Sequence, residues 1–272
     1  MNIHFLYPSY PFDSNTIDSS YENELSACIE NGFTYSFIDT EQLSNNRLEV
    51  SKKHPIPEGA LLIYRGWMLN DIQYNTLMKL EDKGYRLCTS KEQYFYSHYI
   101  VNWYSSVSEF TMPTLFCSIS DIVDTMKEHN MNNAFVKDYV KSLTTKEGSI
   151  AQSPDEAVRI ARAIETYRGF IDGGIALRKI VKLQDELENR YFVINGEVFS
   201  HNNVIPDIAL EIAGKHSAPF YTIDIGKTLD GNDILIEIGD GQVSDIKQWN
   251  ANLLYSKIKQ AFSFKHQTRN KI

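Results

Sequence analysis

Residues Tyr221 to Gly241 read YTIDIGKTLDGNDILIEIGDG, and this stretch determines how the rest of the chain is interpreted. Two runs of alternating apolar residues flank Asp230-Gly231, a dipeptide typical of a tight β-hairpin turn. With a two-residue turn, Asp224 faces Glu237, and their Cβ atoms lie roughly 4.5–5.5 Å apart. Two facing carboxylates favour a divalent cation such as Mg²⁺, which takes one or two carboxylates together with phosphate oxygens. A loop with an odd number of residues would separate Asp224 from Glu237. The alternative to a metal site is a solvated hairpin face.

The composition is that of an ordinary soluble globular protein. The 272 residues include 42% hydrophobic residues, which allows a well-buried core and two domains. A formal net charge of −8 argues against general nucleic-acid binding. The sequence has no apolar run near the roughly 20 residues that cross a bilayer, and its start does not resemble a signal peptide. Three cysteines without metal or redox spacing suit a reducing compartment, so we expect a cytoplasmic protein without a membrane partner.

Segments typical of strands and helices alternate over the first 90 residues. Strands are expected at 2–7, 33–38, 60–64 and 85–88, and helices at 21–32 and 70–84. This alternation predicts a small parallel α/β unit covering residues 1–90.

Antiparallel signals dominate from residue 133 to about 262. We expect strands at 134–140 and 175–183, a helix at 153–168 that begins with a capping box, a hairpin about Asn195-Gly196, a terminal helix at 249–262 and a loose polar tail at 263–272. The change of character indicates a second domain.

Two lysines mark a candidate phosphate site. Lys137 and Lys141 lie four residues apart in VKDYVKS, so they share a face in either a strand or a helix. Two ammonium groups on one face are costly unless an anion lies between them, and phosphate is the obvious anion. A solvated edge strand carrying lysines is the alternative. The following loop, SLTTKEGS, offers hydroxyl groups but is not a Walker A motif.

Three arginines lie where an anion is expected. Arg178 lies among the alternating apolar residues of IALRKIVKL and needs an anionic partner if it is buried. Arg190 lies at the open end of the hairpin about Asn195-Gly196, where we expect it to bind an anion. The alternative is that it lies at a solvated sheet edge. Arg65 follows a buried strand, at the edge where α/β folds bind ligands, and is a candidate for holding a carboxylate or phosphate of a second substrate. Pairing of Arg65 with a local acid is the alternative.

Taken together, four segments resemble the ATP-grasp superfamily. They are VKDYVKS at 136–142, IALRKIVKL at 175–183, ENRYFVINGEV at 188–198 and DIGKTLDGNDILIEIGDGQVS at 224–244. The pattern is most similar to the clade named for one arginine and two lysines. The resemblance implies an ATP-grasp fold, two antiparallel lobes that clasp ATP, over residues 91–262. A small Rossmann-like α/β domain at 1–90 would precede it.

The resemblance also implies roles for individual residues. Those expected to bind the nucleotide are Lys137, Lys141, Arg178, Lys179, Ile180, Val181, Glu188 and Arg190, with the adenine hinge at 180–183. Arg178 and Arg190 are also the expected catalytic residues, because they face the charge that spreads during phosphoryl transfer. Mg²⁺ is expected on Asp224 and Glu237. Asp240 would replace the asparagine of the usual E-x-N ending, shifted by one residue.

The implied activity is the ATP- and Mg²⁺-dependent ligation of a carboxylate to an amine through an acyl-phosphate. The expected partners are a small-molecule or peptide carboxylate and an amine. An ATP-dependent kinase or a ligase that joins other groups is the enzymatic alternative. A module that binds nucleotide without turnover is the non-enzymatic alternative.

Overall fold

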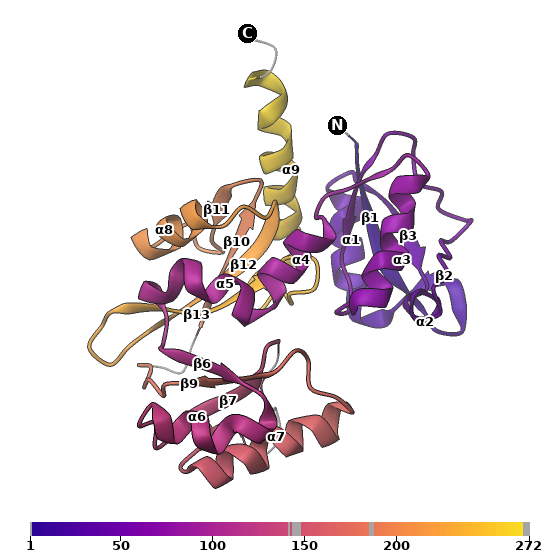
Figure 1. The fold of residues 1–272 in the computed structure, drawn as a ribbon. Helices are drawn as coiled ribbons and strands as arrows, with labels where there is room; N and C mark the ends of the chain where they lie inside the picture. Colours follow the sequence, from indigo (N-terminus) through magenta and orange to yellow (C-terminus); the bar gives the residue numbers. More distant parts are fainter. Residues whose placement is uncertain (1, 141, 143–147, 185–187, 269–272) are drawn as a thin grey trace. The chain divides into compact units, whose positions relative to one another are not determined.

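The computed structural model describes residues 2–140, 142, 148–184 and 188–268, with backbone alone for 264–268 (Figure 1). The chain forms two compact units. Unit 1 comprises Met1–Phe95, Arg190–Ile223 and Gly239–Ile272, and unit 2 comprises Tyr96–Asn189 and Asp224–Ile238. These units group residues by packing, so the sequence limits at 1–90, 91–262 and 263–272 stay a prediction.

Unit 1 contains a five-stranded, mostly parallel sheet. Its strands are β1 (Ile3–Tyr10), β2 (Asp13–Ile17), β3 (Thr34–Ile38), β4 (Leu61–Tyr64) and β5 (Arg86–Leu87). Strand β1 pairs in parallel with β3 and β4, whereas β2 folds back antiparallel on the end of β1. Alternation along β1 buries both faces, since Phe5 and Tyr7 join one core and Leu6 joins the other.

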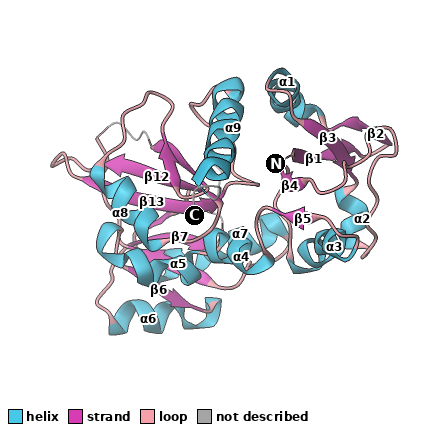
Figure 2. Cartoon of the chain, turned by 90° about the horizontal axis from the view of Figure 1, so that it is seen from above, coloured by secondary structure: helices cyan, strands magenta, loops and turns pink. Residues whose placement is uncertain are grey.

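Helices cover both faces of this sheet, as Figure 2 shows for α1 and α3. The helices of this part are α1 (Glu22–Glu30), α2 (Thr40–Ser44), α3 (Asp71–Asp82) and α4 (Lys91–His98). Helix α1 contributes Ala27 and Cys28 to one core, and α3 contributes Tyr74 and Leu77 to the other. The predicted α/β arrangement of the first segment is therefore confirmed.

Later segments complete unit 1. They are β10 (Asn189–Ile194), β11 (Glu197–Phe199), α8 (Asp207–Lys215) and α9 (Ala251–Thr268). The hairpin between β10 and β11 has the expected two-residue turn, with Phe192 facing Phe199 and positive φ at Asn195 and Gly196. Helix α9 extends beyond its predicted end at Phe262. In the described part of the chain no helix is long and apolar enough to cross a membrane.

Unit 2 is built on the antiparallel sheet β6-β9-β7-β8. Its elements are α5 (Ile100–Val107), β6 (Thr114–Cys117), α6 (Ile122–Glu128), β7 (Ala134–Asp138), β8 (Ile150–Ala151), α7 (Pro154–Arg168) and β9 (Ile175–Arg178). Helices α6 and α7 pack on one face through Met126, Ile160 and Ile164. Ser153 caps α7 as predicted, but the Glu156 carboxylate accepts from the Gln152 N–H instead of closing the capping box.

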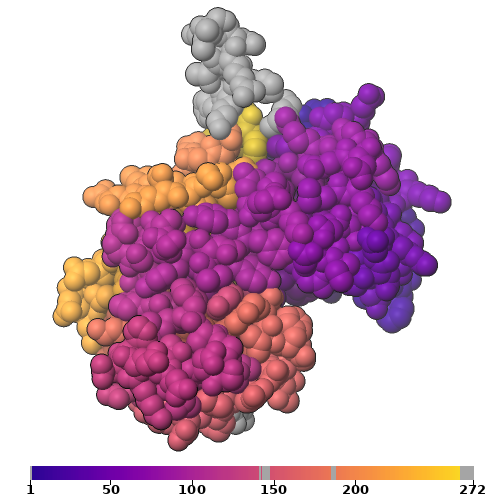
Figure 3. Space-filling model, in the orientation of Figure 1, coloured from indigo at the N-terminus to yellow at the C-terminus, as the bar shows by residue number. Residues whose placement is uncertain are grey.

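The hairpin of β12 (Phe220–Lys227) and β13 (Asp233–Asp240) turns through a three-residue loop. The Thr228 N–H donates to the Asn232 carbonyl at 2.9 Å, and the Gly231 N–H donates to the Thr228 carbonyl at 2.9 Å. Gly231 has a φ of +84°, which is the left-handed position that follows a type I turn in such loops. The predicted two-residue turn is therefore wrong, because Asp-Gly suits both loop lengths. The loop lies at the surface (Figure 3), where Leu229 is 59% exposed.

The register of this hairpin changes between its two ends. Near the turn Thr228 faces Asn232, whereas at the far end the Gly241 N–H donates to the Phe220 carbonyl, a pairing shifted by one residue. In β13 the buried residues Leu235 and Ile238 lie three positions apart, an odd spacing that regular alternation does not give. Both observations indicate a bulge in β13. The facing of Asp224 and Glu237 stays a prediction.

The loop conformation gives a first testable prediction. We expect Gly231→Ala to lower the free energy of unfolding by about 1 kcal/mol, because alanine must adopt the left-handed conformation. Steric contact is not the cause, since the nearest atom to an added Cβ is Gln184 Nε2 at 4.0 Å. The control is Gly214→Ala in α8, where φ is not positive and space is open, so stability should rise by up to about 1 kcal/mol. Equal shifts in urea denaturation for both variants would contradict this account.

Candidate functional site

Lys137 is a buried cation near the end of β7. Its side chain is 6% exposed, and Nζ donates to Oε1 of Glu237 at 2.5 Å. Glu237, on β13, is 35% exposed, so its carboxylate lies at the margin of the buried region. A buried ammonium requires such a partner. The negative charge that was predicted to need a metal is thus balanced in part by Lys137.

Arg178, at the end of β9, is buried among neutral acceptors. Nη1 donates to the Ile236 carbonyl at 2.8 Å and Nη2 to Oγ1 of Thr111 at 2.8 Å. Nε is buried and has no hydrogen-bond partner among the described residues. Burial lowers the pKa of Arg178, and the negative charges of Glu237 and Glu188 partly offset this effect. The sequence predicted an anionic partner for this arginine, and the hydrogen-bond partners described here are neutral.

The two strands place these cations on one face of the unit 2 sheet. Arg178 faces Phe135 in the antiparallel pair of β7 and β9, and Lys137 lies two residues beyond Phe135. Positions two apart on a strand point to the same side. Diagonal neighbours of this kind are roughly 7–8 Å apart. The sheet therefore presents two buried cations together, an arrangement suited to a polyanion.

Asp138 anchors the end of β7 and was not anticipated from the sequence. It is fully buried and forms an ion pair with Arg168, the last residue of α7. The neighbouring ring of Tyr139 packs on Gly173, where an added Cβ would lie 2.4 Å from the ring. These contacts fix the strand end that leads to Lys141, which itself lies outside the described residues, as do 143–147. The sequence signal that could have indicated a buried Asp138 was its position between Lys137 and Lys141 in an otherwise apolar strand.

The predicted adenine hinge runs beside the hairpin loop of unit 2. Residues 179–181 continue from β9, and Leu183 forms a bridge with Thr228. Gly226 leaves room for this segment, because a Cβ there would lie 3.1 Å from the Leu183 side chain. Glu188 is half-buried further along. The nucleotide contacts assigned to this segment stay a prediction.

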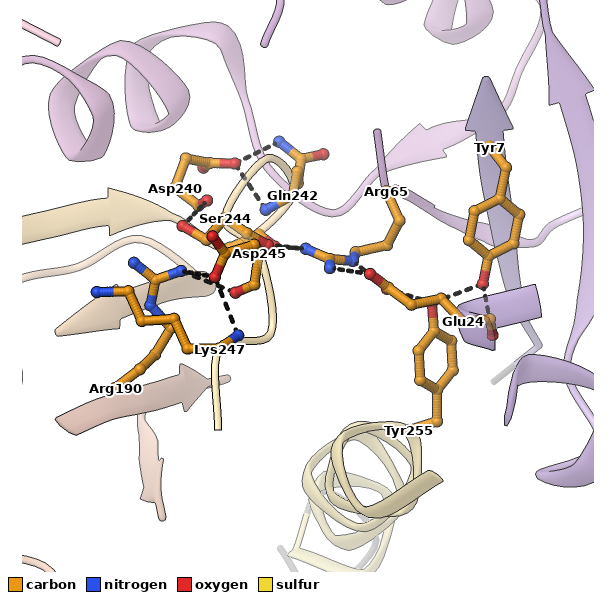
Figure 4. Close-up of polar contacts among 11 residues, drawn as sticks. Tyr7, Glu24, Arg65, Arg190, Asp240, Gln242, Ser244, Asp245, Lys247 and Tyr255 are labelled. Atoms are coloured by element: carbon orange, nitrogen blue, oxygen red, sulfur yellow. Dashed lines mark hydrogen bonds and ion pairs between the residues drawn. The ribbon is translucent and has the colours of Figure 1, made fainter. Parts of the chain in front are cut away.

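Asp240, in unit 1, is a fully buried carboxylate at the end of β13 (Figure 4). Oδ1 accepts from the Gln242 N–H at 2.9 Å and from its side-chain amide at 3.2 Å. Oδ2 is buried without a hydrogen-bond partner in the described part of the chain. Burial raises the pKa of Asp240 to about 7, although the Gln242 hydrogen bonds and the charge of Arg65 act in the opposite direction.

Mg²⁺ prefers carboxylate oxygens as ligands. The unpartnered oxygen of Asp240 and the half-exposed carboxylate of Glu237 are of this kind. Asp224 is a buried carboxylate on β12. Among the described residues, however, no three His, Cys, Asp or Glu side chains are grouped closely enough to form a metal site by themselves. The three predicted ligands therefore stay a prediction.

Arg190 and Arg65, both in unit 1, form hydrogen bonds to the loop after β13. Arg190 is buried, and Nη1 donates to the Asp245 carbonyl at 2.7 Å and to its carboxylate at 3.0 Å (Figure 4). Arg65 is 1% exposed and binds the Glu24 carboxylate with two hydrogen bonds of 2.7 and 2.6 Å. The environment of Arg65 is thus the alternative considered above, pairing with an acid. The phosphate contact assigned to Arg190 stays a prediction.

The mostly parallel sheet of unit 1 and the two antiparallel sheets, β6-β9-β7-β8 and β11-β10-β12-β13, are the arrangement of the ATP-grasp class of fold. Residues 94–258 match the model of an ATP-grasp domain family, the third family of the clade named for one arginine and two lysines, and the chain belongs to this family. The resemblance drawn from the sequence is confirmed. None of the curated proteins matches this sequence.

Solved structures of ligases share the fold over almost the whole chain. D-cycloserine synthetase DcsG has a TM-score of 0.59 at 13% identity, covering 95% of this chain and 100% of that one. The ATP-grasp ligase PsnB complexed with precursor peptide PsnA2 and AMPPNP has a TM-score of 0.59 at 12% identity, covering 96% and 98%. D-alanyl-alanine synthetase A from Vibrio cholerae has a TM-score of 0.57 at 12% identity, covering 96% and 98%. At these identities the similarity establishes the fold.

A double-mutant cycle tests the Lys137–Glu237 ion pair. Glu237→Gln leaves a buried ammonium without a charged partner, so we expect the free energy of unfolding to fall by about 1–3 kcal/mol. Lys137→Met leaves a carboxylate that water can reach, so its effect should be smaller. We expect a coupling energy of about 1–2 kcal/mol from urea denaturation. The exposed pair Arg162–Glu165 on α7 is the matched control and should couple by less than about 0.5 kcal/mol. Equal coupling in both pairs would contradict a buried interaction.

The raised pKa of Asp240 predicts a pH dependence of stability. A carboxyl whose pKa rises from 3.8 to about 7 on folding favours the folded state below pH 4 and loses this contribution as pH rises through about 7. Asn at this position stays neutral, so Asp240→Asn should not lose stability as the pH rises. Without Mg²⁺, the free energy of unfolding of the variant relative to the parent should rise between pH 4 and 7 by up to about 4 kcal/mol. A difference that is flat with pH would show that the carboxyl ionises normally.

Proposed function

We propose that this protein is an ATP- and Mg²⁺-dependent ligase that joins a carboxylate to an amine. The observation that supports the proposal most strongly is the pair of buried cations, Lys137 and Arg178, on one face of the unit 2 sheet. Arg178 in particular is buried with neutral acceptors, and a phosphate oxygen is a stronger partner for a guanidinium than a carbonyl. Because the chain belongs to the ATP-grasp family, the polyanion expected here is the triphosphate group of ATP.

The chemistry that we propose needs no nucleophile from the protein. A substrate carboxylate oxygen attacks the γ-phosphorus of ATP, the bond to the bridging oxygen breaks, and ADP leaves. The amine nitrogen then attacks the carbonyl carbon of the acyl-phosphate, loses a proton and expels phosphate. Charge spreads over the γ-phosphate oxygens in the first step, so positioned cations and Mg²⁺ supply most of the catalysis. Lys137 and Arg178 are the described residues that suit this role, and we assign Lys141 and Arg190 to it as well.

Mg²⁺ would be held by Asp224 and Glu237, with Asp240 as a further ligand, and would neutralise phosphate charge. Glu237 is engaged by Lys137 at 2.5 Å. Binding of phosphate to Lys137 and of Mg²⁺ to Glu237 replaces the Lys137–Glu237 ion pair by two new ones. Either ligand alone leaves one of the two side chains without its partner, so each ligand lowers the cost of binding the other. We therefore expect ATP and Mg²⁺ to bind cooperatively.

The substrates are proposed by class alone. One structure of the same fold is named a D-cycloserine synthetase, and others are complexes with a precursor peptide. Both small molecules and peptides are therefore reasonable sources of the carboxylate and the amine.

Arg178→Lys tests the nucleotide site. Mg²⁺-ATP that binds only the folded protein should raise the melting temperature of the parent by mass action. Lysine lacks the planar guanidinium, so ATP affinity measured by calorimetry should fall at least about tenfold. Arg162→Lys, an exposed substitution on α7, is the control and should match the parent. Unchanged ATP affinity in Arg178→Lys would exclude the assigned role.

Product analysis tests the reaction. A carboxylate–amine ligase releases ADP and free phosphate in equal amounts, and only when both substrates are present. A kinase instead transfers phosphate to a stable product, and a binding module releases neither. Screening amino acids, peptides and protein acceptors for the release of both ADP and free phosphate therefore distinguishes the three. Nucleotide binding without release under any combination would contradict the ligase assignment.

A further inference from the structure

The loop that follows β13 is held in unit 1 by a buried network centred on Arg65 (Figure 4). The guanidinium of Arg65 faces two groups at once. Nε and Nη2 donate to the two carboxylate oxygens of Glu24, and Nη1 donates to the carbonyls of Gly241 at 2.5 Å and Ser244 at 2.8 Å. Arg65 thus links helix α1 to both ends of a four-residue stretch of the loop.

The acid in this network is itself positioned by aromatic side chains. Tyr255, on α9, donates its hydroxyl to Oε2 of Glu24 at 3.0 Å, and the hydroxyls of Tyr7 and Tyr255 are 2.6 Å apart. Burial alone lowers the pKa of Arg65, but Glu24 outweighs it and raises that pKa above its ordinary value. The guanidinium therefore stays charged in a buried setting, with a planar two-point contact that fixes its orientation.

The loop in turn positions the carboxylate of Asp240. The Gln242 N–H donates to Oδ1 of Asp240 at 2.9 Å, and the Ser244 hydroxyl donates to the Asp240 carbonyl at 2.8 Å. A second contact from the Arg65 segment strengthens the arrangement, because the Gly66 N–H donates to the Gln242 carbonyl at 3.0 Å. A change at Arg65 therefore affects Asp240 through the backbone of two residues, Gly241 and Gln242.

Close packing leaves no room for a side chain at two glycines of this stretch. A Cβ on Gly239 would lie 2.9 Å from the hydroxyl oxygens of Ser244 and Thr222, and one on Gly241 would lie 2.7 Å from the ring of Phe220. Real Cβ atoms essentially never lie within 3.0 Å of another heavy atom outside their own chain neighbours. The backbone thus fits closely against its neighbours at both glycines, while Arg65 binds the carbonyls of Gly241 and Ser244.

We propose that Arg65 and Glu24 form a clamp that sets the conformation of residues 241–244 and thereby the position of the Asp240 carboxylate for Mg²⁺. Arg65 is then a positioning residue and does not contact the second substrate. The role rests on the proposed function, because Mg²⁺ binding at Asp240 belongs to that assignment.

The clamp is tested with Arg65→Lys and Glu24→Gln in the full-length protein. Lysine keeps the charge but cannot bind Glu24 and two carbonyls in one plane, and glutamine keeps the shape of Glu24 but loses its charge. Ile63→Val, two residues before Arg65 in β4 and in the same unit, is the control, because it loosens the buried core without touching the loop. All measurements are made well below the melting temperature of each variant, so that every variant is folded.

Two readouts separate positioning from simple stability. Hydrogen exchange of the amides of residues 241–244 should speed up at least about tenfold in both clamp variants and stay near the parental rate in Ile63→Val. The Mg²⁺ concentration that half-saturates ATP binding should rise at least about fivefold in the clamp variants and not in the control. Unchanged exchange in Arg65→Lys overturns the clamp. Faster exchange with unchanged Mg²⁺ dependence overturns the positioning role.

The parent protein separates this inference from the proposed function. A parent whose melting temperature does not respond to Mg²⁺-ATP overturns the proposed function, and the positioning role with it, whatever the exchange rates show. A parent that responds, together with clamp variants that respond equally at every Mg²⁺ concentration, overturns the clamp alone.

Discussion

A buried guanidinium is costly unless both its charge and its hydrogen-bonding capacity are satisfied, and the two units of this protein differ in how fully they satisfy it. In unit 1, Arg65 has its own carboxylate in Glu24 and two backbone carbonyls. In unit 2, Arg178 is equally buried but contacts a carbonyl and a hydroxyl, and its Nε is unsatisfied among the described residues. A guanidinium that lacks a carboxylate partner is costly in the folded protein by itself. This difference separates an arginine that supports the structure from one that is suited to bind an anion.

The same reasoning applies to the carboxylates of the β12–β13 hairpin. Glu237 is half-exposed and engaged by Lys137, so its charge is balanced from within unit 2. Asp240 is fully buried, has one unsatisfied oxygen and shows a raised pKa, so its charge is not balanced to the same degree. A bound divalent cation would therefore reduce the electrostatic cost of the Asp240 carboxylate more than that of the Glu237 carboxylate. Asp240 therefore has a stronger electrostatic reason to bind a cation than its departure from the usual E-x-N spacing suggests.

Local sequence signals predicted most elements of the fold, but not the partners of its buried charges. Strand and helix periodicity indicated the parallel unit around β1, and Asn195-Gly196 predicted a two-residue turn that the structure has. Asp230-Gly231 gave the wrong loop length, because the same dipeptide also suits a three-residue loop. The bulge further along β13 compensates for the extra residue. The sequence offered a substrate anion or a local acid as the partner of Arg65, but it did not identify Glu24, which lies on α1 and meets Arg65 only through tertiary packing. Local patterns thus identify charges that need partners, and tertiary packing decides which of them are left for a ligand.

Preorganisation connects these points to function. Rigid placement of a ligand-binding group lowers the entropy that binding must remove, and this effect grows with the number of contacts that hold the group. Residues 241–245 are held by Arg65 on one side, by Arg190 through Asp245 on the other, and by close packing at Gly239 and Gly241. Asp240 directly precedes this constrained stretch, and its Oδ2 is buried without a hydrogen-bond partner among the described residues. The cost of burying Asp240 is thus already part of the folded state, so a cation bound there, as we propose, would gain more of the interaction free energy.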